Sequence, residues 1–466
     1  MNKPTPWNPA PRPRRKRAAW AILALALPAA AAPVTASPSS AEITVTAPGV
    51  DAPETLTLDS AVLFALEHNE LVRESEAGAR KARAGVREVS ANNLPQVSVS
   101  AQAVRQKEST ATLPGATGPI SLTLAAPHAE VASANLTQAL DIFGQVRRAR
   151  NIASLAARIE ALNVARSRSE VTFETRAAYY DVLRAAGAVE VAQAAVEDAT
   201  EQLRLAHSFV NAGSAAPFDV TRADVALADR RQTLLGARNS LALAGAAFNN
   251  VLGRPVSTPV RVTALSTAPN RDVDIDGQTE KALVARPEVL QADLAVEAQR
   301  ETVRLHRLDT APMIALTGSA THLFNPTGLS SQADTWTAGV GASWPLWDSG
   351  AARARVDAAK ANVEVAGLQR EQLRRGVALE VRQAGLNVQD TSDRFDVADK
   401  TVGQAEEALR LARTRYQNGV SAQIEVLDAE TALVQARFNR NNALYDHLAA
   451  RAAFDRALMG RLSAGG

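Results

Sequence analysis

The chain has 466 residues, of which 46% are hydrophobic but only 4% aromatic, with a formal net charge of +2 and no cysteine. This aliphatic, small-residue balance suits close-packed helices better than a sandwich or barrel enzyme. The lack of cysteine excludes a disulfide framework and also a lipid-modified N-terminal cysteine.

The first forty residues predict a secretory signal peptide. Six basic residues precede an apolar run at 18–32, and small residues suited to cleavage follow from Ala32 to Ala41. A transmembrane anchor is the alternative, but this run is interrupted by Pro28 and is shorter than the roughly 20 residues that a bilayer requires. Removal of residues 1–41, the signal peptide and the start of the mature N-terminus, brings the net charge from +2 to −4. Nucleic-acid binding then loses its main support.

The rest of the chain contains an internal duplication. Gly144 matches Gly350, and Gly213 matches Gly419, at a constant offset of 206. Further upstream, Pro95 matches Pro312 at an offset of 217, so a loop in the first copy is predicted to be 11 residues longer. The expected divisions are a first repeat at 42–253, a linker at 254–277, a second repeat at 278–460 and a tail at 461–466.

Each repeat is predicted to begin with a helix and to continue with two short strands. The four strand segments alternate apolar and polar residues and lie at 96–103, 131–138, 313–321 and 335–347. In the last segment, Trp336 and Trp344 share a face and lie about 26 Å apart along a strand, close to the roughly 25 Å apolar band of a membrane barrel. A soluble sheet edge is the alternative. The polar second face of the strands favours a wet lumen.

Four strands cannot close a barrel, and an open sheet edge is not tolerated in lipid. A symmetric oligomer that pools its strands solves this problem. We therefore expect several copies of the chain to share one barrel, with Trp336, Trp344 and Trp347 in its aromatic girdle.

A very long helix follows the strands in each repeat. From 182 to 210, apolar residues recur at steps of four and three, which is a coiled-coil seam. A helix from Gly144 to Val210 has 67 residues and would be roughly 100 Å long. The returning helix repeats Val, Leu or Phe at every seventh position from Val220 and is expected to end at Gly253.

The second hairpin turns within the segment RYQNGVSAQIEVLDAE at 415–430. Gly419, like Gly213 in the first copy, accepts the positive φ that a tight turn needs. Glu425 and Asp428 follow at i and i+3 and therefore share one face of the restarted helix. In a single hairpin, such acids at the start of a helix are interpreted as neutralising the helix dipole.

These segments resemble TolC-type outer-membrane factors. The resemblance covers about residues 55–460 and is carried by LTLDSAVLFALEHNELV, ALVARPEVLQA, WPLWDSGAARARV and the 415–430 segment. It implies a mixed, mainly α, internally duplicated fold. Three chains would form a 12-stranded transmembrane β-barrel in a Gram-negative outer membrane, in contact with its lipid and continued by a helical coiled-coil tunnel into the periplasm. It also implies an exit duct for a tripartite efflux pump or a type I secretion system.

The resemblance also assigns roles at the helix tips. Glu425 and Asp428 would form the pore constriction, and Tyr416 would lock neighbouring helices. The chain departs from the family pattern at Glu70, where a proline is usual, and at Arg222, which replaces the acid found at Asp428. Arg222 could pair with Asp219, so that only the second copy lines the pore. The residues expected to dock a periplasmic adaptor, or membrane fusion protein, are Gly213, Ser214, Gly419 and Val420.

The sequence contains no enzyme motif. Its six histidines lack metal-ligand spacing, and it has no phosphate loop or nucleophile elbow. No cofactor, metal or catalytic residue is therefore predicted, and the energy must come from an inner-membrane pump of RND or ABC type. A periplasmic coiled-coil adaptor or scaffold is the alternative function, although adaptors lack four amphipathic strands with aromatic ends.

Overall fold

In the computed structural model, the described residues are 56–115, 118–125, 127–213, 215–264, 269–324 and 332–458. They all belong to one unit, Ala52–Gly466. The predicted signal peptide, the tip residue Ser214 and the tail 461–466 lie outside the described residues. No helix within these ranges has the length and apolar character needed to cross a bilayer.

The helix predicted at the start of each repeat is two helices, so the prediction of a single helix was wrong. In the first repeat, α1 (Leu58–His68) and α2 (Glu70–Ala91) meet at Asn69, whose backbone is extended. The Asn69 side chain accepts a hydrogen bond from the Leu71 N–H and donates one to the Val251 carbonyl at 2.8 Å. An asparagine cap thus breaks the helix without the proline usual in the family.

The second repeat has the same break, here with a proline. Helix α5 (Ile275–Ala285) ends at Arg286, which is extended, and α6 (Pro287–His306) begins at the proline that follows. Pro287 disfavours a helical conformation for the residue before it, which explains the break.

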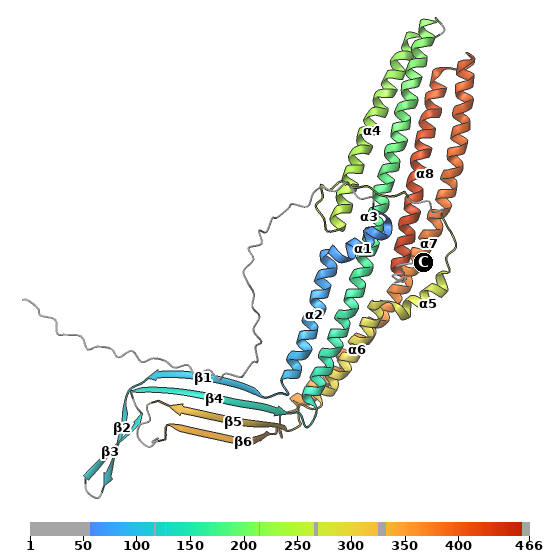
Figure 1. Ribbon diagram of the computed structural model, residues 1–466. Coiled ribbons are helices and arrows are strands. Elements are labelled where there is room, and N and C mark those ends of the chain that lie inside the picture. Colours follow the sequence, from blue (N-terminus) through green and yellow to red (C-terminus); the bar gives the residue numbers. More distant parts are fainter. Residues whose placement is uncertain are drawn as a thin grey trace, which may run out of the picture. The chain divides into compact units, whose positions relative to one another are not determined.

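Four antiparallel strands form one sheet with the order β1-β4-β5-β6 (Figure 1). The strands are β1 (Gln96–Arg105), β4 (His128–Leu140), β5 (Met313–Leu323) and β6 (Asp334–Ser343). The longer loop of the first repeat holds a separate hairpin of β2 (Ser109–Gly115) and β3 (Gly118–Ala125). This hairpin accounts for the offset difference between the repeats.

One face of the sheet is apolar across its middle rows. Val99, Ala134, Ala320 and Trp336 lie opposite one another across all four strands. In the same middle rows, the other face carries small and polar side chains without a charge, and hydroxyl groups pair across it in Ser100–Ser133 and Ser319–Thr337, each at 2.8 Å. Among the described residues, the outer edges of β1 and β6 pair with no other strand.

The last strand is shorter than predicted. Strand β6 ends at Ser343, so Trp344 and Trp347 lie in the turn that leads to the next helix. The Trp344 indole donates a hydrogen bond to the Thr310 carbonyl at 3.0 Å, and Pro345 has no N–H to extend the ladder. Only Trp336 of the three predicted girdle residues lies within a strand.

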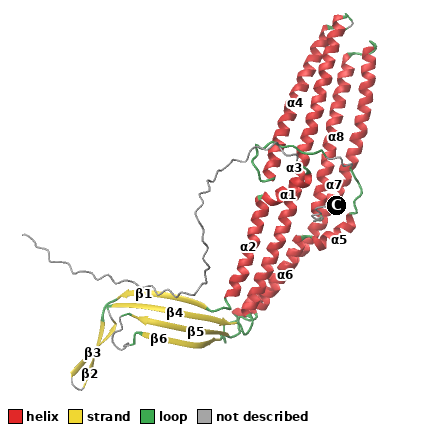
Figure 2. Ribbon diagram, in the orientation of Figure 1, coloured by secondary structure: helices red, strands yellow, loops and turns green. Residues whose placement is uncertain are grey.

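Two long helical hairpins follow the strands (Figure 2). Helices α3 (Gln145–Asn211) and α7 (Ala351–Gln417) have 67 residues each, the length predicted for the first copy. They return through α4 (Pro217–Val251) and α8 (Gln423–Ala457). The predicted stop at Gly253 is confirmed, because this residue has φ 71° just after α4.

The predicted seam is buried mainly through its small residues. Ala192, Ala199 and Ala206 of α3 are buried, whereas Val189 and Val196 of the same seam are only half-buried. Alanine at these positions lets the neighbouring helices approach closely.

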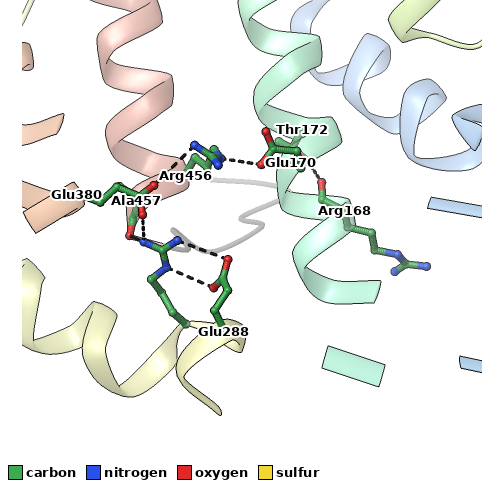
Figure 3. A network of polar contacts seen from close by, with 8 residues as sticks. Arg168, Glu170, Thr172, Glu288, Glu380, Arg456 and Ala457 are labelled. Atoms are coloured by element: carbon green, nitrogen blue, oxygen red, sulfur yellow. Dashed lines mark hydrogen bonds and ion pairs between the residues drawn. The ribbon is translucent and has the colours of Figure 1, made fainter. Parts of the chain in front are cut away.

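A polar network fixes the base of the second hairpin (Figure 3). The buried Arg286 side chain lies 2.6 Å from Glu380 of α7 and donates to the Ala457 carbonyl at the end of α8, at 3.2 Å. Arg456 of α8 lies 2.7 Å from Glu170 of α3 and 3.6 Å from Glu380. Both repeats are therefore joined by charged contacts at this level.

Candidate functional site at the helix tips

Each hairpin reverses at a glycine with a left-handed backbone. Gly213 has φ 73° and Gly419 has φ 71°. The Gly419 N–H donates to the Tyr416 carbonyl at 3.0 Å, and the Val420 N–H donates to the Arg415 carbonyl at 2.9 Å. A Cβ at either glycine would meet open space, so the backbone angle and not crowding favours glycine here.

The two acids after the second turn are both exposed. Glu425 lies in the first turn of α8 and Asp428 one turn later, whereas Val426 between them is fully buried. The Glu425 carboxylate lies 3.7 Å from the Arg415 guanidinium, a loose and exposed ion pair. Within the described part of the chain, Asp428 has no ion pair and no three His, Cys, Asp or Glu side chains gather as metal ligands. Both carboxylates therefore lie on the exposed surface of the tip.

The expected pair between Asp219 and Arg222 does not form. The Arg222 guanidinium instead lies 4.9 Å from the centre of the Phe218 ring. A stacked cation of this kind gains energy from the ring face without a carboxylate. Asp219 lies near Tyr416 of the other hairpin, and its charge adds to burial in raising the pKa of the Tyr416 phenol.

Tyr416 contacts the first hairpin through its ring. The ring meets Phe209 of α3 edge-on, with centroids 5.4 Å apart at 87°. It also packs against a small apolar cluster that includes Leu409, Val426 and Leu433. The Tyr416 hydroxyl has no hydrogen-bond partner among the described residues.

The sequence reasoning missed a charged contact that joins three helices just above the tips. Arg413 of α7 lies 2.9 Å from Glu430 of α8 and 3.2 Å from Asp198 of α3. Glu430 is buried, and this burial raises the pKa of its carboxyl while Arg413 opposes the shift. One feature of the sequence does point to this contact: Glu430 is an acid on the apolar stripe of α8, between Val426 and Leu433.

A second contact links the returning helices of the two hairpins, α4 and α8, at the same level. The Arg230 guanidinium of α4 donates to the Thr431 hydroxyl of α8 at 2.7 Å. Together with Arg413, it holds the second hairpin against the first close to the acids.

An open sheet with one apolar face, continued by two helical hairpins with acids at one tip, is the chain plan of an outer-membrane export channel. The chain belongs to the outer membrane efflux protein family, whose model matches residues 64–254 and 279–460. These two ranges correspond to the two repeats.

Individual relatives agree with this assignment. The outer membrane protein TolC of Escherichia coli (strain K12) is 25% identical over 338 residues, 69% of this chain and 67% of that protein. Nodulation protein T of Rhizobium leguminosarum bv. trifolii is 23% identical over 290 residues, 61% of this chain and 62% of that protein. The solved structure of the outer-membrane channel OprN superposes with a TM-score of 0.71, at 23% identity, over 87% of this chain and 90% of that one.

The family and the fold together decide between the two functions predicted from the sequence. The chain is an outer-membrane channel protein, and the alternative of a periplasmic adaptor or scaffold is not favoured. The predicted mainly helical, duplicated fold is confirmed.

Proposed function

We propose that three copies of the chain form a continuous export duct, with a 12-stranded barrel in the outer membrane and a helical tunnel that closes at its periplasmic tips. The observation that carries this proposal is the open sheet. Strands β1 and β6 expose every residue, and their outer edges pair with no other strand that the structure describes. In a bilayer such edges must pair with other strands, and a threefold ring of sheets pairs them all.

The tips act as the gate of this duct. Threefold symmetry brings three copies of Glu425 and Asp428 to a narrow mouth, where rings of carboxylates favour cations and impede anions. The ring contact of Tyr416 with Phe209 and the charged contact of Arg413 hold the second hairpin inward. Opening then requires that these contacts to the first hairpin be released.

Partners supply what the chain lacks. The turns at Gly213, Ser214, Gly419 and Val420 are the docking surface for the helical hairpins of a periplasmic adaptor, and Gly213, Gly419 and Val420 are exposed. The sequence has no phosphate-binding loop, so an inner-membrane pump of RND or ABC type drives export and selects the cargo. Contact with outer-membrane lipid is made by the apolar face that carries Trp336.

Ion selectivity of the purified channel in a planar bilayer tests the gate. We expect Glu425→Gln combined with Asp428→Asn to bring the cation-to-anion permeability ratio close to unity, because the fixed charge at the mouth is removed. Asp219→Asn is the matched control from the first copy and should keep most of the selectivity. Equal losses in the two variants would overturn the assignment of the constriction to the second repeat.

A further inference from the structure

The turns that connect the sheet to the long helices expose large apolar side chains. After β6, Trp344, Leu346 and Trp347 are 60%, 76% and 85% exposed. After β4, Ile142 and Phe143 are also exposed. Side chains of this size are seldom left in water together, and tryptophan favours the boundary between lipid tails and headgroups. These five residues form the apolar part of what is here called the collar.

Four arginines lie beside these apolar residues. Arg147 and Arg353 are the third residues of α3 and α7, at equivalent positions in the two repeats. Arg150 lies one turn further along α3, and Arg307 follows the end of α6 next to β5. All four are exposed, and none makes an ion pair with any residue that the structure describes. They form the basic part of the collar.

The acids of the same region are already occupied. Asp141 accepts hydrogen bonds from the Val146 and Arg147 N–H groups at the start of α3, at 3.0 and 2.9 Å. Asp348 accepts them from Gly350 and Ala352 at the start of α7. These carboxylates neutralise the positive helix ends.

Asp309, the remaining acid of these turns, is bound by Arg355 at 2.7 Å. The four collar arginines therefore have no ion-pair partner among the described residues, although the charge of Arg353 acts on Asp357. Their exposed guanidinium groups are open to an external anion.

We propose that the collar binds the phosphates of anionic phospholipids in the inner leaflet of the outer membrane. The collar continues the apolar face of the sheet, which the proposed function places against lipid, and it lies at the end of the sheet that leads into the helices. A guanidinium binds phosphate oxygens through two parallel hydrogen bonds, while the neighbouring indoles occupy the headgroup level. Repeat symmetry places an equivalent arginine in both halves of each chain. The inference rests on the outer-membrane location and is independent of channel activity.

The test compares lipids retained by the intact, purified assembly. The protein is placed in nanodiscs of mixed phosphatidylglycerol and phosphatidylcholine, released in the gas phase, and its bound lipids are counted by native mass spectrometry. We expect phosphatidylglycerol to be enriched roughly threefold or more over its share of the bilayer, as several arginines near an anionic surface would give. The double variant Arg147→Gln with Arg353→Gln should lose most of this enrichment.

Matched variants distinguish lipid binding at the collar from a nonspecific effect of the protein's positive charge. Arg231→Gln with Arg375→Gln removes two exposed arginines from the helical part and should keep the enrichment, and Arg147→Lys with Arg353→Lys should restore part of it. An unchanged melting temperature shows that the collar variant still folds. The proposal is overturned if the collar variant keeps its phosphatidylglycerol, if the helical control loses as much, or if inorganic phosphate displaces the lipid completely.

Discussion

Arg413 is the residue whose loss should change the gate most. It lies between carboxylates of two different helices, and one of them, Glu430, is buried. Removing one partner of a fully buried ion pair costs about 3–5 kcal/mol. The Arg413 side chain is 39% exposed, so solvent screening reduces this to an expected cost of about 1–2 kcal/mol.

Arg413→Met is therefore expected to raise the resting conductance of the channel by roughly tenfold, since 1.4 kcal/mol corresponds to about one decade. Arg410→Met is the matched control. Arg410 pairs with Glu407 on the exposed surface of the same helix, at 2.6 Å, where such a pair contributes little. A similar rise in both variants would show that Arg413 has no special role in closure.

Tyr416 allows a sharper test, because its ring and its hydroxyl can be separated. The ring contacts Phe209 of the first hairpin, whereas the hydroxyl has no partner among the residues that the structure describes. We expect Tyr416→Phe to leave the resting conductance within about twofold, and Tyr416→Ala to raise it, because an aromatic pair contributes about 0.5–1.5 kcal/mol beyond burial. A fully open channel in Tyr416→Phe would instead assign the lock to the hydroxyl.

At the scale of elements, the regular parts were predictable and the irregular parts were not. The long helix was predicted from Gly144 to Val210 and lies at Gln145–Asn211, because a seven-residue seam is a local and repeated signal. The break at Asn69 escaped prediction, because the asparagine amide is held by Val251, 182 residues away in the sequence. The contacts of Arg286 span 94 and 171 residues and were missed for the same reason.

At the candidate site, too, local features could be predicted from the sequence and long-range contacts could not. That Glu425 and Asp428 share one face of α8 follows from their spacing of three residues and was predicted, and the structure shows both side chains exposed. The predicted Asp219–Arg222 pair was wrong, because the Arg222 guanidinium lies over the Phe218 ring instead. The contact between Arg413 and Asp198 could not be predicted from the sequence, because the two residues become neighbours only when the two hairpins pack together. The roles of the tip residues stay predictions.

The segment between the repeats is attached to the second hairpin by a buried histidine, His447. Its Nε2 atom accepts a hydrogen bond from the Asn270 N–H at 3.2 Å, and its Nδ1 atom lies 3.3 Å from the Thr391 hydroxyl. Burial lowers the pKa of His447 below its ordinary value of 6.5, and the nearby Arg451 lowers it further. Asp396 and a backbone hydrogen bond to Val388 oppose this shift.

The sign of the pH effect follows from the lowered pKa. The folded chain prefers the neutral imidazole, so its contribution to stability is complete above about pH 6.5 and is lost as the pH falls below that value, by at most about 1.4 kcal/mol per pH unit. The melting temperature of the wild type should therefore fall more steeply on acidification than that of His447→Gln. His207→Gln, at an exposed histidine of α3, should behave as the wild type does. Identical pH profiles for all three proteins would contradict this role of His447.

At the scale of the whole molecule, one chain exposes surfaces that it cannot satisfy alone. Among the described residues, its sheet has two unpaired edges and an apolar face. The helices bury much of their seam through alanine rather than through large side chains. Apolar residues such as Leu368, Leu386 and Val397 of α7 remain exposed. Each of these features is explained if further copies of the chain pack beside the first, in the barrel and along the tunnel.

The mass of the assembly purified from outer membranes tests this account most directly. Native mass spectrometry after detergent removal in the gas phase should give three chains per particle, and unheated samples should migrate as a trimer that heat converts to the monomer. A mature chain that stays monomeric and soluble in buffer without detergent would contradict the account, because its open sheet edges would then be stable in water without partners.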